Sequence, residues 1–321
     1  TGNTVGLDVN TSKRYKTIAI SQLTPYWTED GVSRRYEIFY RTLRPPLVDD
    51  DHDYRVNTLG GSVKFGVPFT ELDRVFFGIG VEANKVETYS DSPWRYKQFV
   101  ADNGGPKANA NPYHGGNATA LGIPLTVAWQ RDSRDSALVP TDGRLQRANL
   151  ELSLLGDMRY YRATYQHQYY FPLFLDGTLM LNGEMDYGHG FGDKTYPVFK
   201  NFYAGGIGSV RGFESSSLGR KEESYYGREY VGGAKRVIGN IELQFPIPGA
   251  DRTLRWFTFV DAGNVFAEEE TIKVGELRYS TGFGVSWVSP MGPLRLSMGY
   301  PLNAKSGDQR EVFQFTLGTG F

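Results

Sequence analysis

The side chains that most often carry out acid–base or metal chemistry are few and scattered in this chain. No Gly-x-Ser-x-Gly elbow, His-Glu-x-x-His zinc motif or phosphate-binding loop occurs. The histidines are His52, His114, His167 and His189. His167 lies in an alternating run, 159–171, on the face of Tyr161 and Tyr165, which favours a structural histidine over a catalytic base. We predict a protein that is not an enzyme and that has no cofactor and no metal site.

The remaining charged residues give limited guidance about partners. Asp49, Asp50, Asp51 and Asp53 form an acidic cluster. Such a cluster could bind a cation, but a solvated loop tip is the favoured interpretation. The chain has no cysteine, which excludes disulfides and thiolate metal sites. Its formal net charge of -1 gives no reason to expect a nucleic-acid partner.

The elements that must position these side chains are strands. Near the C-terminus, Phe313, Phe315, Leu317 and Phe321 share one face of an alternating run, and Gln314, Thr316 and Gly318 share the other. A side-chain period of two is typical of a β-strand. The same pattern recurs along the chain, for example in 59–69, 75–84, 121–129, 147–154, 179–186 and 236–245.

Two features favour a membrane-spanning β-barrel over a soluble sandwich. The runs are longer than the roughly 5–6 residues of an ordinary strand, and no segment with a convincing helical period interrupts them. A barrel also reconciles long apolar faces with the low mean hydropathy of -0.43, because only alternate residues face lipid. No apolar run of about 18 residues occurs, so a helical span is excluded. We expect an all-β, antiparallel up-and-down barrel with about 14 strands in this chain.

The connections between the expected strands alternate between short and long. Short turns are expected at 172–176, 246–251 and 289–293, and long connections at 87–119 and 190–234. In an outer-membrane barrel the short turns face the periplasm and the long loops face outside. Structureless connections as long as 190–234 are uncommon and are usually functional or disordered.

The longest connection carries a motif that identifies a family. It contains Phe202-Tyr203-Ala204-Gly205-Gly206 followed by Val210-Arg211-Gly212-Phe213, and a later strand contains Phe259-Val260-Asp261-Ala262-Gly263. With these motifs the chain resembles the outer-membrane β-barrel assembly family of BamA-type insertases. In that family the Val-Arg-Gly-Phe/Tyr tip folds back into the barrel lumen, and its arginine meets a wall motif of the form Phe-x-Asp-x-Gly.

The resemblance implies a pair between Arg211 and Asp261. By parity, Phe259, Asp261 and Gly263 share the inner face of their strand, and the opposite face suits lipid. An arginine in a partly dehydrated lumen needs an acceptor, and a carboxylate gives a charge-assisted, bidentate one. Removing one partner of such a buried pair costs about 3–5 kcal/mol, because the other charge is left stranded.

The resemblance extends to the end of the chain. The terminal run is similar to the family's last strand and to the general outer-membrane targeting signal, which ends in an aromatic residue such as Phe321. The last strand forms one side of the family's lateral seam, so Phe313, Phe315, Leu317, Gly318 and Phe321 are candidate seam and signal residues. Gly318 is expected within the strand 312–321, where it either permits a kink or simply packs against a neighbour.

The resemblance covers nearly the whole sequence, with departures. It implies a single transmembrane barrel domain over 1–321. Family members carry periplasmic domains ahead of a 16-stranded barrel, and these domains are absent from this sequence. Pro25-Tyr26-Trp27 aligns so that Thr1 falls about two strands into the family barrel. We therefore expect a barrel fragment whose seam is open or made differently.

The implied function is to fold and insert other β-barrel proteins into the Gram-negative outer membrane, as a multi-pass protein, by templating strands at the seam. Its partners would be unfolded outer-membrane proteins, membrane lipid and lipopolysaccharide, and assembly-complex lipoproteins that bind mostly through the periplasmic domains. A pore for two-partner secretion or autotransporter assembly shares the fold and the arginine tip, and remains an alternative. A passive porin also shows the alternation, but the tip and wall motifs speak against it.

Overall fold

A single curved antiparallel sheet forms most of the molecule. The computed structural model describes residues 2–11, 15–44, 54–110, 113–224, 227–251 and 253–318. In these residues the sheet has 14 strands, and each strand pairs with the next strand of the sheet along the chain. The short strands β10, β11, β12 and β17 lie outside this sheet, so β9 pairs with β13 and β16 pairs with β18. The strands are β1 (Thr4–Thr11), β2 (Tyr15–Thr24), β3 (Ser33–Leu43), β4 (Tyr54–Pro68), β5 (Asp73–Thr88), β6 (Gly116–Asp132), β7 (Gly143–Gly156), β8 (Tyr160–Pro172), β9 (Thr178–Gly190), β13 (Lys235–Pro246), β14 (Arg255–Phe266), β15 (Arg278–Ser289), β16 (Gly292–Pro301) and β18 (Phe313–Leu317).

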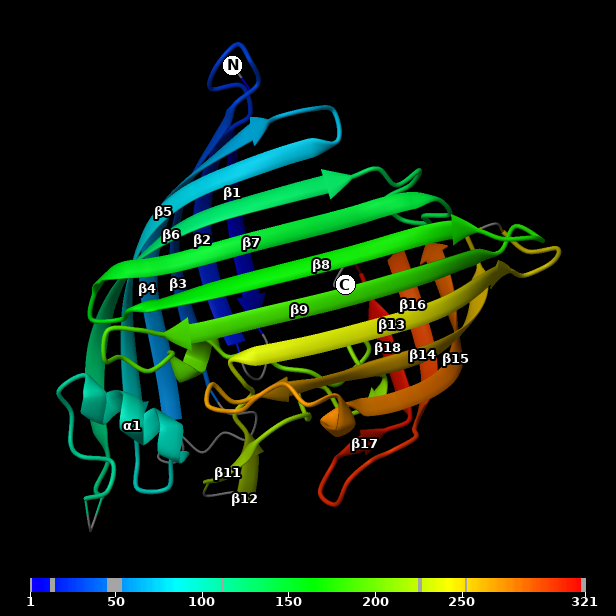
Figure 1. The fold of residues 1–321 in the computed structure, drawn as a ribbon. Helices are drawn as coiled ribbons and strands as arrows, with labels where there is room; N and C mark the ends of the chain where they lie inside the picture. Colours follow the sequence, from blue (N-terminus) through cyan, green and yellow to red (C-terminus); the bar gives the residue numbers. More distant parts are fainter. Residues whose placement is uncertain are drawn as a thin grey trace.

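The sheet curls into an incomplete cylinder whose two edges are β1 and β18 (Figure 1). The expected antiparallel β-barrel fold, with about 14 strands in this chain, is confirmed. None of the helices in the described residues is both long and apolar enough to span a membrane.

Polar and apolar faces alternate along the strands in the sense expected for a barrel in lipid. Large apolar side chains stand exposed on the outer face, among them Ile38, Val127, Ile241, Phe283 and Phe315. The inner face holds buried charged groups such as Glu242 and Asp261. A water-soluble sandwich would bury the first set and expose the second, so this distribution matches a lipid-facing exterior.

Smaller elements gather at the end of the barrel where the long connections lie (Figure 1). They are α1 (Trp94–Asp102), η1 (Val198–Lys200), β10 (Gly212–Phe213), β11 (Lys221–Ser224), β12 (Gly227–Tyr230), η2 (Val274–Glu276) and β17 (Arg310–Glu311). The sequence pattern predicted no helix, yet α1 forms inside the 87–119 connection. Its buried face consists of only Tyr96, Phe99 and Val100, which is too short a repeat to give a periodic signal.

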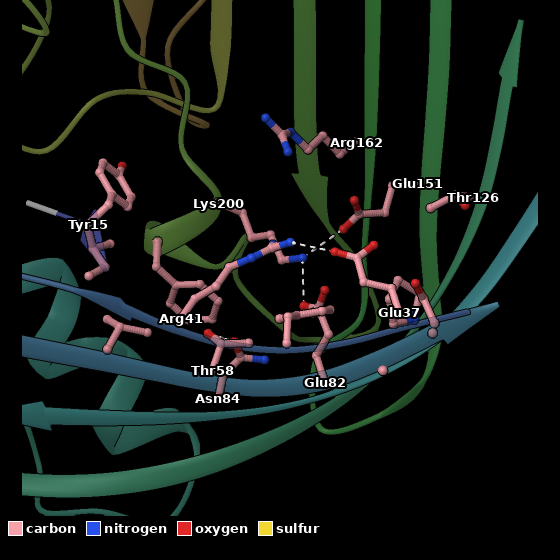
Figure 2. A pocket seen from close by; sticks show the side chains of 18 of the residues that line it. Tyr15, Glu37, Arg41, Thr58, Glu82, Asn84, Thr126, Glu151, Arg162 and Lys200 are labelled. Carbon is pink, nitrogen blue, oxygen red and sulfur yellow. Dashed lines mark hydrogen bonds and ion pairs between the residues drawn. The ribbon is translucent and has the colours of Figure 1, made fainter. Parts of the chain in front are cut away.

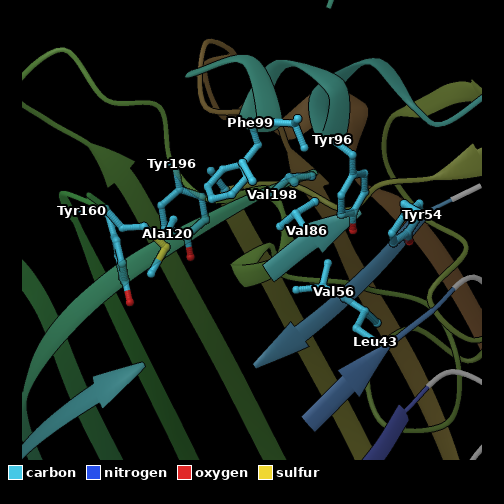
Figure 3. Close-up of a cluster of buried hydrophobic side chains, with 14 residues drawn as sticks. Leu43, Tyr54, Val56, Val86, Tyr96, Phe99, Ala120, Tyr160, Tyr196 and Val198 are labelled. Carbon is cyan, nitrogen blue, oxygen red and sulfur yellow. The ribbon is translucent and has the colours of Figure 1, made fainter. Parts of the chain in front are cut away.

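The helix α1 packs on an apolar cluster that caps this end of the barrel (Figure 3). Its Tyr96 stacks on Tyr54 at the start of β4, with ring centroids 3.6 Å apart. Phe99 lies close to Phe199 of η1 in an edge-on contact at 5.1 Å. The cap thereby fixes the first part of the connection between β9 and β13 against the strand ends.

The C-terminal run differs from its predicted form. In the described part of the predicted strand 312–321, only Phe313–Leu317 is a strand, β18. Val312, which is 45% exposed, breaks the run between β17 and β18. The break occurs because β17 pairs with β10 of the long connection, whereas β18 pairs with β16. Gly318 lies after the last residue of β18 with φ at 102°, and its N–H donates to the carbonyl of Pro293 at 2.8 Å. It therefore ends the described strand, where the prediction placed it inside one.

Two sequence-based predictions fall outside the described residues. These are the acidic cluster at 49–53 and the terminal aromatic Phe321.

Candidate luminal site

The connection between β9 and β13 enters the barrel and places the Val210–Phe213 tip against the inner wall. A turn forms the tip, with the Gly206 N–H donating to the Val210 carbonyl at 3.1 Å. Gly205 and Gly206 have φ values of 105° and 96°, which favour glycine at both positions. Val210 and Phe213 are fully buried and pack with Ile238 of β13 and Val265 of β14. The apolar side chains thus seat the tip, and Arg211 projects between them.

Arg211 meets Asp261 in the manner that the motifs imply. The guanidinium donates from Nε and Nη2 to the two carboxylate oxygens of Asp261, both at 2.7 Å, and the backbone N–H of Arg211 donates to Asp261 Oδ2 at 3.0 Å. Arg211 is 3% exposed and Asp261 is fully buried. The pair is bidentate and dehydrated, a geometry that fixes both the position and the orientation of the tip.

The wall motif surrounds this pair. The Phe259 ring lies under the guanidinium, with the Arg211 Cζ 3.5 Å from the ring centroid. Gly263 leaves room for the tip, because a Cβ at this position would meet Val210 Cγ2 at 2.9 Å. Val210, Arg211, Gly212, Phe213, Phe259, Asp261 and Gly263 are therefore brought together in one place. Phe313, Phe315 and Leu317 instead lie on the exposed outer face of β18.

Further charged and polar residues complete the site, and the motifs did not reveal them. Glu242 of β13 is fully buried and accepts a bond from Arg211 Nη1 at 2.5 Å and another from Arg295 of β16. Asn240 donates to Asp261 Oδ1 at 2.8 Å and to the Ser209 carbonyl at 2.7 Å. Parity places Asn240 and Glu242 on the inner face, but only the register, with Asn240 opposite Asp261, brings them to the tip.

The cluster is electrically balanced and holds its charges fixed. Two guanidinium groups, of Arg211 and Arg295, face two carboxylates, of Asp261 and Glu242. Burial lowers the pKa of Arg211, but its bonds to Asp261 and its attraction to Glu242 more than offset this and raise the pKa above its ordinary value. Such a cluster binds and positions a segment of chain.

The connection makes a second polar anchor, on strands β5 and β7 (Figure 2). Lys200 of η1 donates to Glu82 of β5 and to Glu151 of β7, both at 2.9 Å. Burial lowers the pKa of Lys200, but Glu151, Tyr160 and Glu82 outweigh it and raise the pKa above its ordinary value. Lys200, Glu82 and Glu151 line a cavity of about 390 Å³. No motif pointed to them, since they come from three separate elements.

The histidines take no part in either cluster. His167 lies on β8 between the rings of Tyr165 and Tyr169, whose centroids are 6.5 and 6.2 Å from its own. In the described residues, no group of three or more histidine, aspartate or glutamate side chains could hold a metal ion.

Comparison with known proteins places this architecture in a family. The model of the Omp85 superfamily domain matches residues 1–321. The chain belongs to the Omp85 superfamily. This finding confirms the family that the tip and wall motifs indicated.

Relatives of this Omp85 domain include the outer membrane protein assembly factor BamA of Neisseria meningitidis serogroup B. It is 38% identical over the whole chain, which spans 43% of that relative's length. The sorting and assembly machinery component 50 homolog of Mus musculus is 31% identical over 61% of the chain and 45% of its own length. The chain thus spans less than half the length of these curated relatives.

A solved structure supports the same fold. The crystal structure of BamA from Haemophilus ducreyi lacking POTRA domains 1-3 matches with a TM-score of 0.87 and 25% sequence identity. The match covers 98% of this chain and 64% of that one.

Proposed function

We propose that this chain is the barrel domain of a protein that folds and inserts β-barrel proteins into the outer membrane of a Gram-negative bacterium. The observation that carries the proposal is the full-length similarity to a relative named as an outer membrane protein assembly factor. The tip held on the wall by Arg211 and Asp261 supports the proposal, because it reproduces the motif pair of the insertase family.

The physical task of such a protein is to supply hydrogen-bond partners in lipid. A barrel strand entering a membrane carries unpaired N–H and C=O groups, each costing several kcal/mol. In the described residues, β18 pairs with β16 on one side and with no strand of the sheet on the other. An incoming strand can add to such an edge by β-augmentation. Phe313, Phe315 and Leu317 face outward along it, and Gly318 ends its described part.

This mechanism needs binding and templating but no covalent chemistry. The partners of the domain are unfolded outer-membrane proteins at the edge strand, with lipid and lipopolysaccharide around the apolar exterior. Assembly-complex lipoproteins would bind mostly through parts of the protein outside this chain. Two ion-paired anchors hold the long connection across the lumen, and this favours a role in assembly over passive permeation.

The test is reconstitution of the full-length protein in lipid vesicles. Urea-unfolded client barrels are added, and folding is followed by the shift of the heat-modifiable band on a gel. We expect faster folding than in vesicles without the protein. Equal rates in the two preparations would contradict the proposed function.

A second arm of the same assay examines the proposed role of the pair. We expect the variant Asp261→Ala to remain folded but to lose most of the acceleration, because Arg211 is left without its bidentate partner. The matched control is Asp251→Ala in the β13–β14 turn, an exposed residue whose carboxylate accepts a hydrogen bond from the N–H of Thr253. Full activity of Asp261→Ala would exclude the pair from the mechanism.

A further inference from the structure

The tip also contacts the strand at the edge of the sheet, and this contact is separate from the arginine pair. We propose that Gln314 is a positioning residue that ties β18 to the tip, so that the tip holds the edge strand in place. The consequence for assembly rests on the proposed function, whereas the contact itself does not.

Gln314 bonds to the backbone of the tip. It is the inward-facing residue at the second position of β18 and is 5% exposed. Its Nε2 donates to the carbonyl of Phe213 at 2.7 Å, and its Oε1 accepts from the Gly212 N–H at 3.4 Å. The same Nε2 donates to Glu311 at 3.1 Å. The primary amide is suited to this position because it both donates and accepts.

Backbone pairing extends the contact toward the preceding residues. Gly212 and Phe213 form β10, which pairs antiparallel with Arg310 and Glu311 of β17. The Glu214 N–H donates to the Gln309 carbonyl at 3.1 Å. The chain entering β18 is thus held by the tip before it is held by the sheet.

The sheet itself holds β18 over a short length. In the described residues, strands β16 and β18 share five paired positions, from Met298 opposite Phe313 to Leu294 opposite Leu317. Strands β15 and β16 share ten, from Ser280 opposite Pro301 to Ser289 opposite Gly292. A strand paired over half that length, and from one side only in the described residues, gains a large share of its restraint from the tip.

The tip is therefore bonded at both ends. Arg211 binds β14 through Asp261 and β13 through Glu242, while the next two residues bind β17 and β18. Gly299 of β16 lets the tip pass close to the wall, because a Cβ there would meet the Gly212 N at 2.6 Å. The tip spans the last strands of the sheet from the inside and braces their free edge. Loosening the Gln314 bond would free β18 without disturbing the arginine cluster.

The experiment uses spin labels on introduced cysteines, because this chain has no cysteine of its own. Any cysteine elsewhere in the full-length protein is first replaced by serine. Labels on Phe315→Cys of β18 and Met185→Cys of β9 stand on exposed outer positions. Their distance distribution is measured by pulsed electron resonance on the full-length protein in lipid nanodiscs. The variant Gln314→Glu keeps the size of the side chain but removes the donor to Phe213 at neutral pH.

We expect Gln314→Glu to widen the Phe315–Met185 distribution about twofold. A second label pair, on Ile79→Cys and Phe283→Cys, leaves out β18 and is expected to keep its width. The control Thr316→Val alters the next inward-facing residue of β18, and no effect is expected. Acidification that protonates the new carboxyl and the neighbouring Glu311 restores an O–H donor and removes the repulsion between the two carboxylates, so the narrow distribution is expected to return.

Two results would overturn the proposal: an unchanged distribution in Gln314→Glu, or a widening that persists after protonation. The client-folding assay on the same variant is read separately. A widened distribution with an unchanged folding rate supports the brace but contradicts the use of the edge in the proposed function. An unchanged distribution rejects the brace, whatever the folding rate.

Discussion

At the scale of single residues, Arg211 carries the densest set of contacts at the tip. It makes four hydrogen bonds to two carboxylates and lies over the ring of Phe259. A guanidinium suits this position because its planar fork addresses both oxygens of Asp261 while a third nitrogen reaches Glu242. The fixed charge thus acts through geometry, which a point charge of the same sign cannot reproduce.

We therefore expect Arg211→Lys to behave as a damaging change although it conserves charge. One ammonium cannot form the parallel bonds to Asp261 and also reach Glu242, and the loss is expected to be about 2 kcal/mol of unfolding free energy. The measurement is the urea midpoint at which the heat-modifiable barrel band disappears. Arg35→Lys, on an exposed arginine of β3, serves as the control. Equal midpoints for the two variants would contradict the geometric argument.

At the scale of elements, the long connection is anchored to the sheet at two places. The first anchor is Lys200, which bonds to β5 and β7. The second anchor is the tip, which bonds to β13, β14 and β18. Apolar packing under α1 supports the first anchor, and glycines in the wall make room for the second. The two anchors lie on opposite halves of the sheet, so the connection links strands that are far apart in pairing order.

Because the tip lies so close to the wall at the second anchor, we predict that one added methyl group has a large effect on stability. Gly299→Ala would place a Cβ 2.6 Å from the Gly212 N and 2.9 Å from the Arg211 backbone carbon, both of them backbone atoms that cannot rotate away. We expect a lower thermal unfolding midpoint and a displaced tip. Gly239→Ala on β13 has nothing within 4 Å of its new Cβ and is expected to change stability by no more than about 0.5 kcal/mol. Similar midpoints for the two variants would argue against the close seat.

At the first anchor, we predict that loss of the Lys200 ion pairs loosens the connection locally. Lys200→Met leaves Glu82 and Glu151 without their shared cation inside the lumen, and we expect faster amide hydrogen exchange over 195–203. Lys194→Met changes a half-buried lysine of the same connection, whose bond to the Asp102 carbonyl is 3.4 Å long, and little change is expected. Exchange that is equally slow in both variants would show that the apolar packing alone holds η1.

At the scale of the whole molecule, the barrel reverses the usual placement of polarity. Its exterior is apolar and its lumen holds balanced ion pairs attached to an inserted connection. This arrangement gives the sheet an internal support and narrows the passage through it. Under the proposed function, the apolar exterior would contact lipid and the edge at β18 would receive client strands.

Narrowing of the lumen has a measurable consequence. Replacing 191–234 with a short glycine–serine link removes both anchors of the connection. We then expect the single-channel conductance in planar bilayers to rise severalfold. Unaltered conductance would contradict the placement of the connection across the lumen. A high conductance in the unmodified protein would instead favour the passive-porin alternative.

The amino-acid sequence by itself determined the fold class, the strand count and the family. It did so because the side-chain period of a strand is a local property, and because motifs such as Val210–Phe213 lie within one short segment. The same local rules placed Asp261 and Glu242 on an inner face. The family resemblance, and not these local rules, indicated the Arg211–Asp261 pair.

Only the tertiary structure decided which inward-facing groups meet. Register sets Asn240 opposite Asp261, and curvature brings Arg295, Gln314 and Lys200 toward residues far away in the chain. The break at Val312 has the same origin, because β17 pairs with the tip whereas β18 pairs with β16. Such contacts depend on long-range pairing, which an alternating pattern leaves undetermined.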